Sequence, residues 1–201
     1  LFSEEKKGLL YFCRGLTFKE TKDWNGAEKK FKNALKLNYD PKTTRLQLIE
    51  VYINKQDIES ASTQLAELKK TNEKNETMIF IAGYINYRKG NFQEALTAFE
   101  ILATSSLSAK TNLALLYYNN GDYAKSVEKW EEILSEEPDN KMAQINMGRA
   151  LFHLGDTSKA QEYFSKAGIT PSPGKFSPKK IPLSYENMLE EIKFDLMCKA
   201  E

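Results

Sequence analysis

Apolar residues recur three and four positions apart along this chain, in ten stretches separated by short polar turns. This spacing places the apolar side chains on one face of a helix. It predicts helices at about residues 4–21, 24–37, 42–55, 58–71, 76–89, 92–104, 107–119, 123–136, 141–154 and 157–168. Residues 169–182 hold four prolines and a glycine, which predict an extended linker. Beyond it, Ser184 is predicted to cap a last helix that ends near Lys199.

A short turn with an acidic or amide residue recurs at a nearly constant interval. The residues are Asp23, Asp57, Asn91, Asp122 and Asp156, at intervals of 34, 34, 31 and 34 positions. Such a period predicts stacked repeats, in which one unit cannot bury its apolar face without its neighbours. Gly90, Gly121 and Gly155 precede three of these residues and suit the left-handed end of a helix. The acidic or amide residue is expected to cap the next helix.

Small residues before each turn predict close packing between the two helices of a unit. Gly15 and Gly148 are expected to face Ala27 and Ala160 of the partner helix, so that the backbones approach closely. Aromatic residues further along each unit are expected to fill the gap to the next unit. The third interval is three residues short around positions 104–106, which predicts a short second helix or turn there.

These positions combine into one recurring pattern. A glycine is followed by aromatic or apolar residues three and sixteen positions on and by alanines twelve and nineteen positions on, as in Gly15, Phe18, Ala27, Phe31 and Ala34 and in Gly148, Leu151, Ala160, Phe164 and Ala167. The pattern resembles the tetratricopeptide repeat (TPR) over residues 8–174. The resemblance implies an all-α, right-handed solenoid of five helix–turn–helix units, at about residues 8–41, 42–75, 76–106, 107–140 and 141–174. Residues 175–183 would then link it to the helix at 184–201.

Composition argues against several classes of protein. The formal charge is +1, with 29 basic and 28 acidic residues, so the basic surface typical of nucleic-acid binders is not expected. No run of about 18 apolar residues predicts a membrane span. Cys13 and Cys198 are expected to be buried thiols. The chain begins at Leu1 without a methionine, which is compatible with removal of a leader, lipid anchor or further domain and leaves a cytoplasmic or a bacterial envelope location open.

Sequence motifs for catalysis are absent. His153 is the sole histidine, so clusters of histidines and Ser-His or Cys-His pairs have at most one imidazole to use. The sequence has no phosphate-binding loop of the form GxxxxGK[ST], no GxGxxG motif and no HExxH motif. We therefore expect no enzyme activity, no cofactor and no metal.

The family resemblance implies that the first helix of each unit lines a concave groove. The stripe of these helices that faces away from the partner helix is rich in aliphatic and aromatic residues, and an exposed apolar tract usually marks a partner site. The predicted groove residues are Asn54, Phe80, Tyr84, Tyr87, Arg88, Tyr118, Asn119, Arg149 and Phe152. For the aliphatic members of the stripe, contact with adjacent helices is an equal alternative. The paired Lys and Asn residues with which related co-chaperones hold heat-shock-protein tails are absent.

The leading hypothesis is a scaffold that binds a partner protein through an amphipathic helix or an extended peptide in this groove. One alternative is an assembly or secretion factor like the tetratricopeptide lipoproteins of bacterial envelopes, and another is a regulatory part of a larger enzyme. The predicted C-terminal helix is apolar on more than one narrow face. It is expected either to cap the fifth unit, or to fold into the groove or a neighbouring molecule, which would allow self-association.

Overall fold

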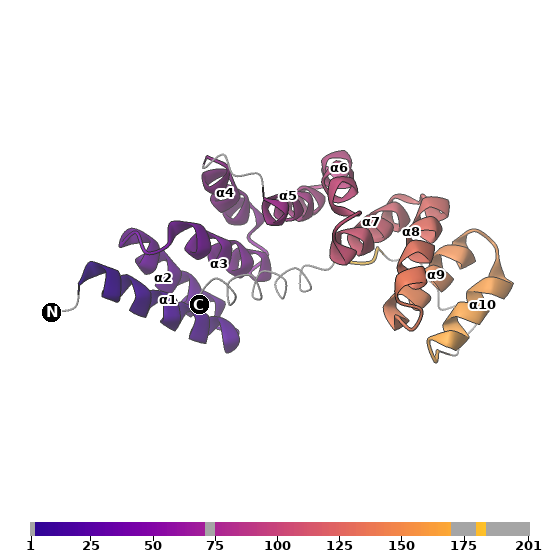
Figure 1. Ribbon diagram of the computed structural model, residues 1–201, viewed down its shortest axis with the longest axis horizontal. Helices are drawn as coiled ribbons and strands as arrows, with labels where there is room; N and C mark the ends of the chain where they lie inside the picture. The colour runs from indigo at the N-terminus through magenta and orange to yellow at the C-terminus, as the bar shows by residue number, and fades with distance from the viewer. Residues whose placement is uncertain (1–2, 71–74, 170–179, 184–201) are drawn as a thin grey trace. The chain divides into compact units, whose positions relative to one another are not determined.

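The computed structural model describes residues 3–70, 75–169 and 180–183 of the chain (Figure 1). Within these ranges the regular structure is entirely α-helical, and each helix lies within two residues of its predicted bounds. The helices are α1 (Glu4–Glu20), α2 (Trp24–Lys36), α3 (Pro41–Asn54), α4 (Ile58–Lys69), α5 (Glu76–Lys89), α6 (Phe92–Leu102), α7 (Leu107–Asn120), α8 (Tyr123–Glu136), α9 (Lys141–His153) and α10 (Thr157–Lys166). The predicted helix over 184–199 and its proposed roles lie outside the described residues.

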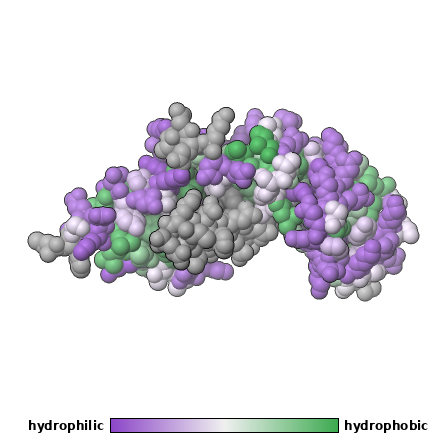
Figure 2. All heavy atoms as spheres, viewed as in Figure 1, coloured by the Kyte–Doolittle hydropathy of each residue, from purple (hydrophilic) through white to green (hydrophobic). Residues whose placement is uncertain are grey.

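The chain forms two compact units, Leu1–Gly90 and Asn91–Glu201. In the first unit, consecutive helices from α1 to α5 pack against each other. In the second unit, consecutive helices from α6 to α10 do the same. Most of the visible face of α8 and α10 is hydrophilic in Figure 2, as expected for helices that bury one stripe.

All five repeat turns place the same position in the left-handed conformation. Gly90, Gly121 and Gly155 have φ values of 86°, 87° and 86°, which glycine adopts without steric cost. Lys22 and Gln56 hold the equivalent positions at 59° and 62° without being glycine. Predicted caps follow three of the turns: the side chains of Asp23, Asp57 and Asp156 accept hydrogen bonds from Gly26, Ser60 and Lys159 backbone amides.

The core repeats with the same period. The residue eight positions after each turn is buried in every case: Phe31, Leu65, Phe99, Trp130 and Phe164 are at most 4% exposed. Packing against these side chains explains the small residues on the preceding helix. A Cβ on Gly15 would lie 2.5 Å from the Phe31 ring, and one on Gly148 would lie 2.8 Å from Phe164. The atoms nearest to an added Cβ on these glycines thus belong to aromatic rings.

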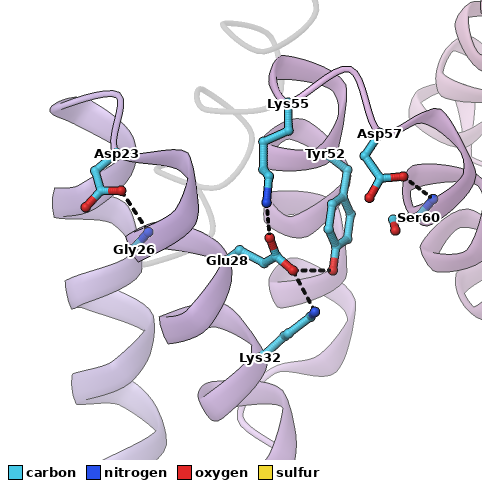
Figure 3. A network of polar contacts seen from close by, with 8 residues as sticks. All are labelled: Asp23, Gly26, Glu28, Lys32, Tyr52, Lys55, Asp57 and Ser60. Atoms are coloured by element: carbon cyan, nitrogen blue, oxygen red, sulfur yellow. Dashed lines mark hydrogen bonds and ion pairs between the residues drawn. The ribbon is translucent and has the colours of Figure 1, made fainter.

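Charged contacts link α2 to α3 in the first unit (Figure 3). The Glu28 carboxylate accepts hydrogen bonds from Lys32 at 2.6 Å and Lys55 at 2.5 Å, and the Tyr52 hydroxyl lies 3.4 Å away. Partial burial raises the pKa of Glu28, but the two lysines outweigh it, and the net effect lowers this pKa. Burial raises the pKa of Tyr52.

Two further predictions can be compared with the structure. The short third interval is accommodated as expected, because α6 ends at Leu102 and only residues 103–106 separate it from α7. The prediction that Cys13 is buried is wrong, because its side chain is exposed. The α1 helix packs against α2 and no described helix precedes it, so one of its faces stays open. Cys198 lies outside the described residues.

Candidate functional site

The predicted groove residues lie in both units, on the first helices of the repeats. The first unit holds Asn54 at the end of α3 and Phe80, Tyr84, Tyr87 and Arg88 on α5. The second unit holds Tyr118 and Asn119 on α7 and Arg149 and Phe152 on α9.

The exposure of these residues differs from the expectation. Phe80, Tyr84 and Tyr118 are buried, at 3%, 7% and 5% exposed, although we expected aromatic residues on an open surface. Burial of these three rings means that this part of the stripe is not an open aromatic surface. The side chains of Asn54, Arg88 and Phe152 are exposed, and those of Tyr87, Asn119 and Arg149 are half-buried.

In the first unit, polar contacts hold the groove residues in place. The Arg88 guanidinium donates to the Tyr84 hydroxyl at 3.2 Å and lies 5.9 Å from the centre of the Tyr84 ring. Asn54 donates through Nδ2 to the backbone carbonyl of Glu50, one turn earlier. Glu50 in turn pairs with Lys19 of α1, and both side chains are less than 10% exposed. The arrangement fixes side-chain positions but leaves the Arg88 charge at the surface.

In the second unit, the Asn119 side chain binds the backbone of Ile181, which lies 62 residues further along the chain. Its Nδ2 donates to the carbonyl oxygen of Ile181 at 2.7 Å, and its Oδ1 accepts from the Ile181 N–H at 2.8 Å. A carboxamide can do both because it carries a donor and an acceptor side by side. Residues Lys180–Leu183 form no helix, and Figure 1 shows this segment beside α7. One side chain thus binds a peptide backbone much as a neighbouring strand does in a sheet.

The residues around Ile181 fit this mode of binding. Pro182 disfavours the helical conformation of the residue before it, so Ile181 is biased toward an extended backbone. In an extended backbone the N–H and C=O of one residue point to the same side, where one carboxamide can reach both. Leu183 is buried at 5% exposure, and the Lys180 ammonium lies 5.3 Å from the centre of the Phe92 ring of α6.

An aromatic cluster lies next to Asn119. The Tyr118 ring makes edge contacts with Tyr123 and His153 at 5.3 and 5.5 Å between centroids. Tyr123 stacks on His153 at 4.6 Å, and Phe152 contacts the same imidazole edge-on at 6.0 Å. Burial and the neighbouring Tyr123 raise the pKa of Tyr118, while the charge of Arg149 lowers it. The cluster joins α7, α8 and α9 and supports the helix end that carries Asn119.

Sequence reasoning missed Ile181, Leu183 and Tyr123. The first two fell within a proline-rich stretch that we interpreted as a linker. The signal that could have found them is the apolar sequence Ile181-Pro182-Leu183, because aliphatic residues in a linker need a surface to cover them. Tyr123 begins the second helix of its unit, and only the three-dimensional contact with His153 reveals its part in the cluster.

Among the residues that the structure describes, no group of three or more His, Cys, Asp or Glu side chains could hold a metal ion. His153 is engaged in ring contacts with Tyr118, Tyr123 and Phe152. A search of the described helices finds none that is long and apolar enough to cross a membrane.

Comparison with known proteins identifies the repeat. Residues 111–172 match a tetratricopeptide repeat family. The chain is 28% identical over 158 residues to the RNA polymerase-associated protein CTR9 of Saccharomyces cerevisiae. The match includes 67% of this chain and 14% of the relative, so this chain corresponds to a small part of that protein.

Solved structures share the fold. A crystal structure of MamA superposes with a TM-score of 0.66 at 24% identity, covering 81% of this chain and 90% of that one. PilF of Pseudomonas aeruginosa gives 0.68 at 16% identity, covering 86% and 81%. YrrB, described as a TPR protein with an unusual peptide-binding site, gives 0.60 at 16% identity, covering 91% and 90%.

The repeat pattern, the helices and the comparisons agree. TPR proteins serve as scaffolds for interactions with proteins or peptides, and proteins of this fold typically are not enzymes. The chain has the all-α fold of tetratricopeptide repeat proteins, and residues 111–172 match that repeat family.

Proposed function

We propose that this chain is a non-enzymatic scaffold that binds a segment of a partner protein on the first helices of its repeats. Of the two kinds of partner predicted from the sequence, an extended peptide is the better fit to the second unit. In the first unit, the predicted groove residues with the exposed Arg88 charge beside Tyr84 form a separate candidate surface.

The observation that carries this proposal is the pair of hydrogen bonds between Asn119 and the backbone of Ile181. Both bonds go to main-chain atoms of the bound residue, so they do not involve its side chain. An extended segment from another protein can present the same two atoms. The surface at Asn119 therefore already has the geometry needed to hold a peptide backbone.

A capture experiment with matched variants tests the proposal. The full chain, N119A and N120A would be used as baits in extracts of cells that naturally make the protein, with the bound proteins quantified by mass spectrometry. Asn120 is exposed and lies next to Asn119 in the same helix, so N120A controls for the substitution itself. We expect a protein that is captured by the full chain and by N120A and is lost with N119A.

Tyr84 is a poorer position for this test. A tyrosine-to-alanine change at a side chain only 7% exposed is expected to destabilise the fold by about 3–5 kcal/mol, as for other large buried aromatic residues. Loss of binding would then report unfolding as much as recognition.

If N119A captures the same proteins in the same amounts as the full chain, the proposed site is wrong.

A further inference from the structure

The Asn119 side chain is already bound by a segment of the same chain, residues 180–183, whose sequence is Lys-Ile-Pro-Leu. We propose that Lys180–Leu183 is an internal competitor for the partner site. The partner segment that displaces it would share its pattern, a basic residue followed by an aliphatic residue, proline and a second aliphatic residue. This inference rests on the proposed function and adds to it a class of ligand and a means of regulation.

One carboxamide cannot serve two backbones in this way. Oδ1 and Nδ2 of Asn119 both bind Ile181, and an incoming segment needs the same two atoms. The internal segment must therefore leave before a partner can make these bonds. Binding of the partner and release of residues 180–183 become a single exchange.

Each residue of the internal segment contributes a separate property to recognition. Lys180 places its charge over the Phe92 ring, a contact that favours a cation. Pro182 keeps Ile181 extended. Leu183 is 5% exposed, so an aliphatic residue at this position gains from leaving water. A displacing segment that lacks one of these features would lose the matching interaction.

The covalent connection sets how strongly the site is masked. Residues 167–179 join the segment to α10, so it competes at a fixed effective concentration. A short tether gives about 1 mM, so a free peptide with an intrinsic Kd of about 100 μM would bind roughly tenfold more weakly to the intact chain. A natural partner overcomes this factor with contacts outside the site.

The test uses a fluorescent, C-terminally amidated peptide, Lys-Lys-Ile-Pro-Leu-Ser, which is the sequence of residues 179–184. In the full-length variant I181P/L183D the internal segment loses the N–H that binds Oδ1 and carries a charge at the buried position. Fluorescence anisotropy should show roughly tenfold tighter binding to this variant than to the wild type. The variant I101D controls for an aliphatic-to-aspartate change, because Ile101 is 59% exposed on α6.

Three comparisons decide the result. Adding N119A to I181P/L183D should weaken peptide binding at least fivefold, and adding N120A should leave it unchanged. The control peptide Lys-Lys-Pro-Pro-Leu-Ser lacks the N–H and should bind about two- to tenfold more weakly, since it loses one of the two backbone bonds. Equal affinity of the test peptide for wild type and I181P/L183D, or no binding to either, would overturn the inference.

A second measurement needs no variant and so avoids any effect on folding. In the wild-type chain, amide hydrogen exchange at Ile181 should be slow, and saturating test peptide should accelerate it. Unchanged exchange with the peptide bound would also overturn the inference. Capture of a partner that depends on Asn119, together with such a result, would leave the proposed function standing and remove only the internal competitor.

Discussion

Single residues determine how closely paired helices approach. Gly148 lies under the edge of the Phe164 ring, where an added Cβ would come within 2.8 to 3.0 Å of three ring atoms. Phe164 is only 2% exposed, so the ring has little room to move. Gly15 and Phe31 repeat the relation at the other end of the array. In these two units the glycine therefore leaves the room that the aromatic ring sixteen positions later occupies.

This close contact predicts the effect of adding one methyl group. An alanine in place of a glycine within a helix ordinarily stabilises it by about 1 kcal/mol. We expect G148A instead to destabilise the chain by about 1–3 kcal/mol, the usual cost of overpacking. Urea denaturation followed by circular dichroism measures the change. The double variant G148A/F164L should recover part of the loss, and a stabilising effect of G148A would contradict the packing.

The Glu28 network predicts a pH-dependent contribution to stability. Its folded pKa is lowered from the ordinary value of 4.5, so the carboxylate stabilises the folded state above that pH. The stabilisation is lost as pH falls through the folded pKa. We expect E28Q to cost about 1 kcal/mol at pH 7 and progressively less below pH 4.5. Urea midpoints of both proteins across this range would show it, whereas a pH-independent difference would exclude the ionic cause.

At the scale of elements, helix bounds could be predicted because their signals are local. Each helix has its own apolar period, and the turns carry residues suited to a left-handed end or a cap. Because these signals recur five times, a turn assigned to the wrong position would not match the other four. The segment Lys180–Leu183 has no such signal, because its place depends on a hydrogen bond to Asn119, 62 residues away.

The turns that lack glycine offer a direct test of the element-scale account. Lys22 and Gln56 adopt positive φ, which costs an ordinary residue roughly 1 kcal/mol relative to glycine. K22G and Q56G should each stabilise the chain by about 0.5–1 kcal/mol, less than the full cost because glycine also gains freedom when unfolded. Thermal unfolding gives the comparison. The variants K22A and Q56A should show no gain, and an equal gain from alanine would point to the loss of the side chain.

At the scale of the whole molecule, the repeats predicted which helices carry the groove residues but not how exposed those residues are. The period and the family resemblance placed all nine groove residues on the first helices of the repeats. Their burial could not be predicted from a helical stripe, since exposure depends on what surrounds Phe80, Tyr84 and Tyr118 in three dimensions. The composition of the stripe was therefore a poor guide to exposure. The role proposed for Asn119 could not be predicted from the sequence, because it depends on a contact with Ile181 in the folded chain.

The proposed function depends most on Asn119 binding the backbone of an extended partner segment. The most direct test uses the full-length variant I181P/L183D, in which the internal segment does not compete, with and without N119A or N120A. Titration calorimetry measures its affinity for the minimal segment of the captured partner. Two lost hydrogen bonds of about 0.5–1.5 kcal/mol each predict at least a fivefold weaker Kd with N119A and an unchanged Kd with N120A. Equal affinity with and without N119A, with both proteins folded, would contradict the proposal.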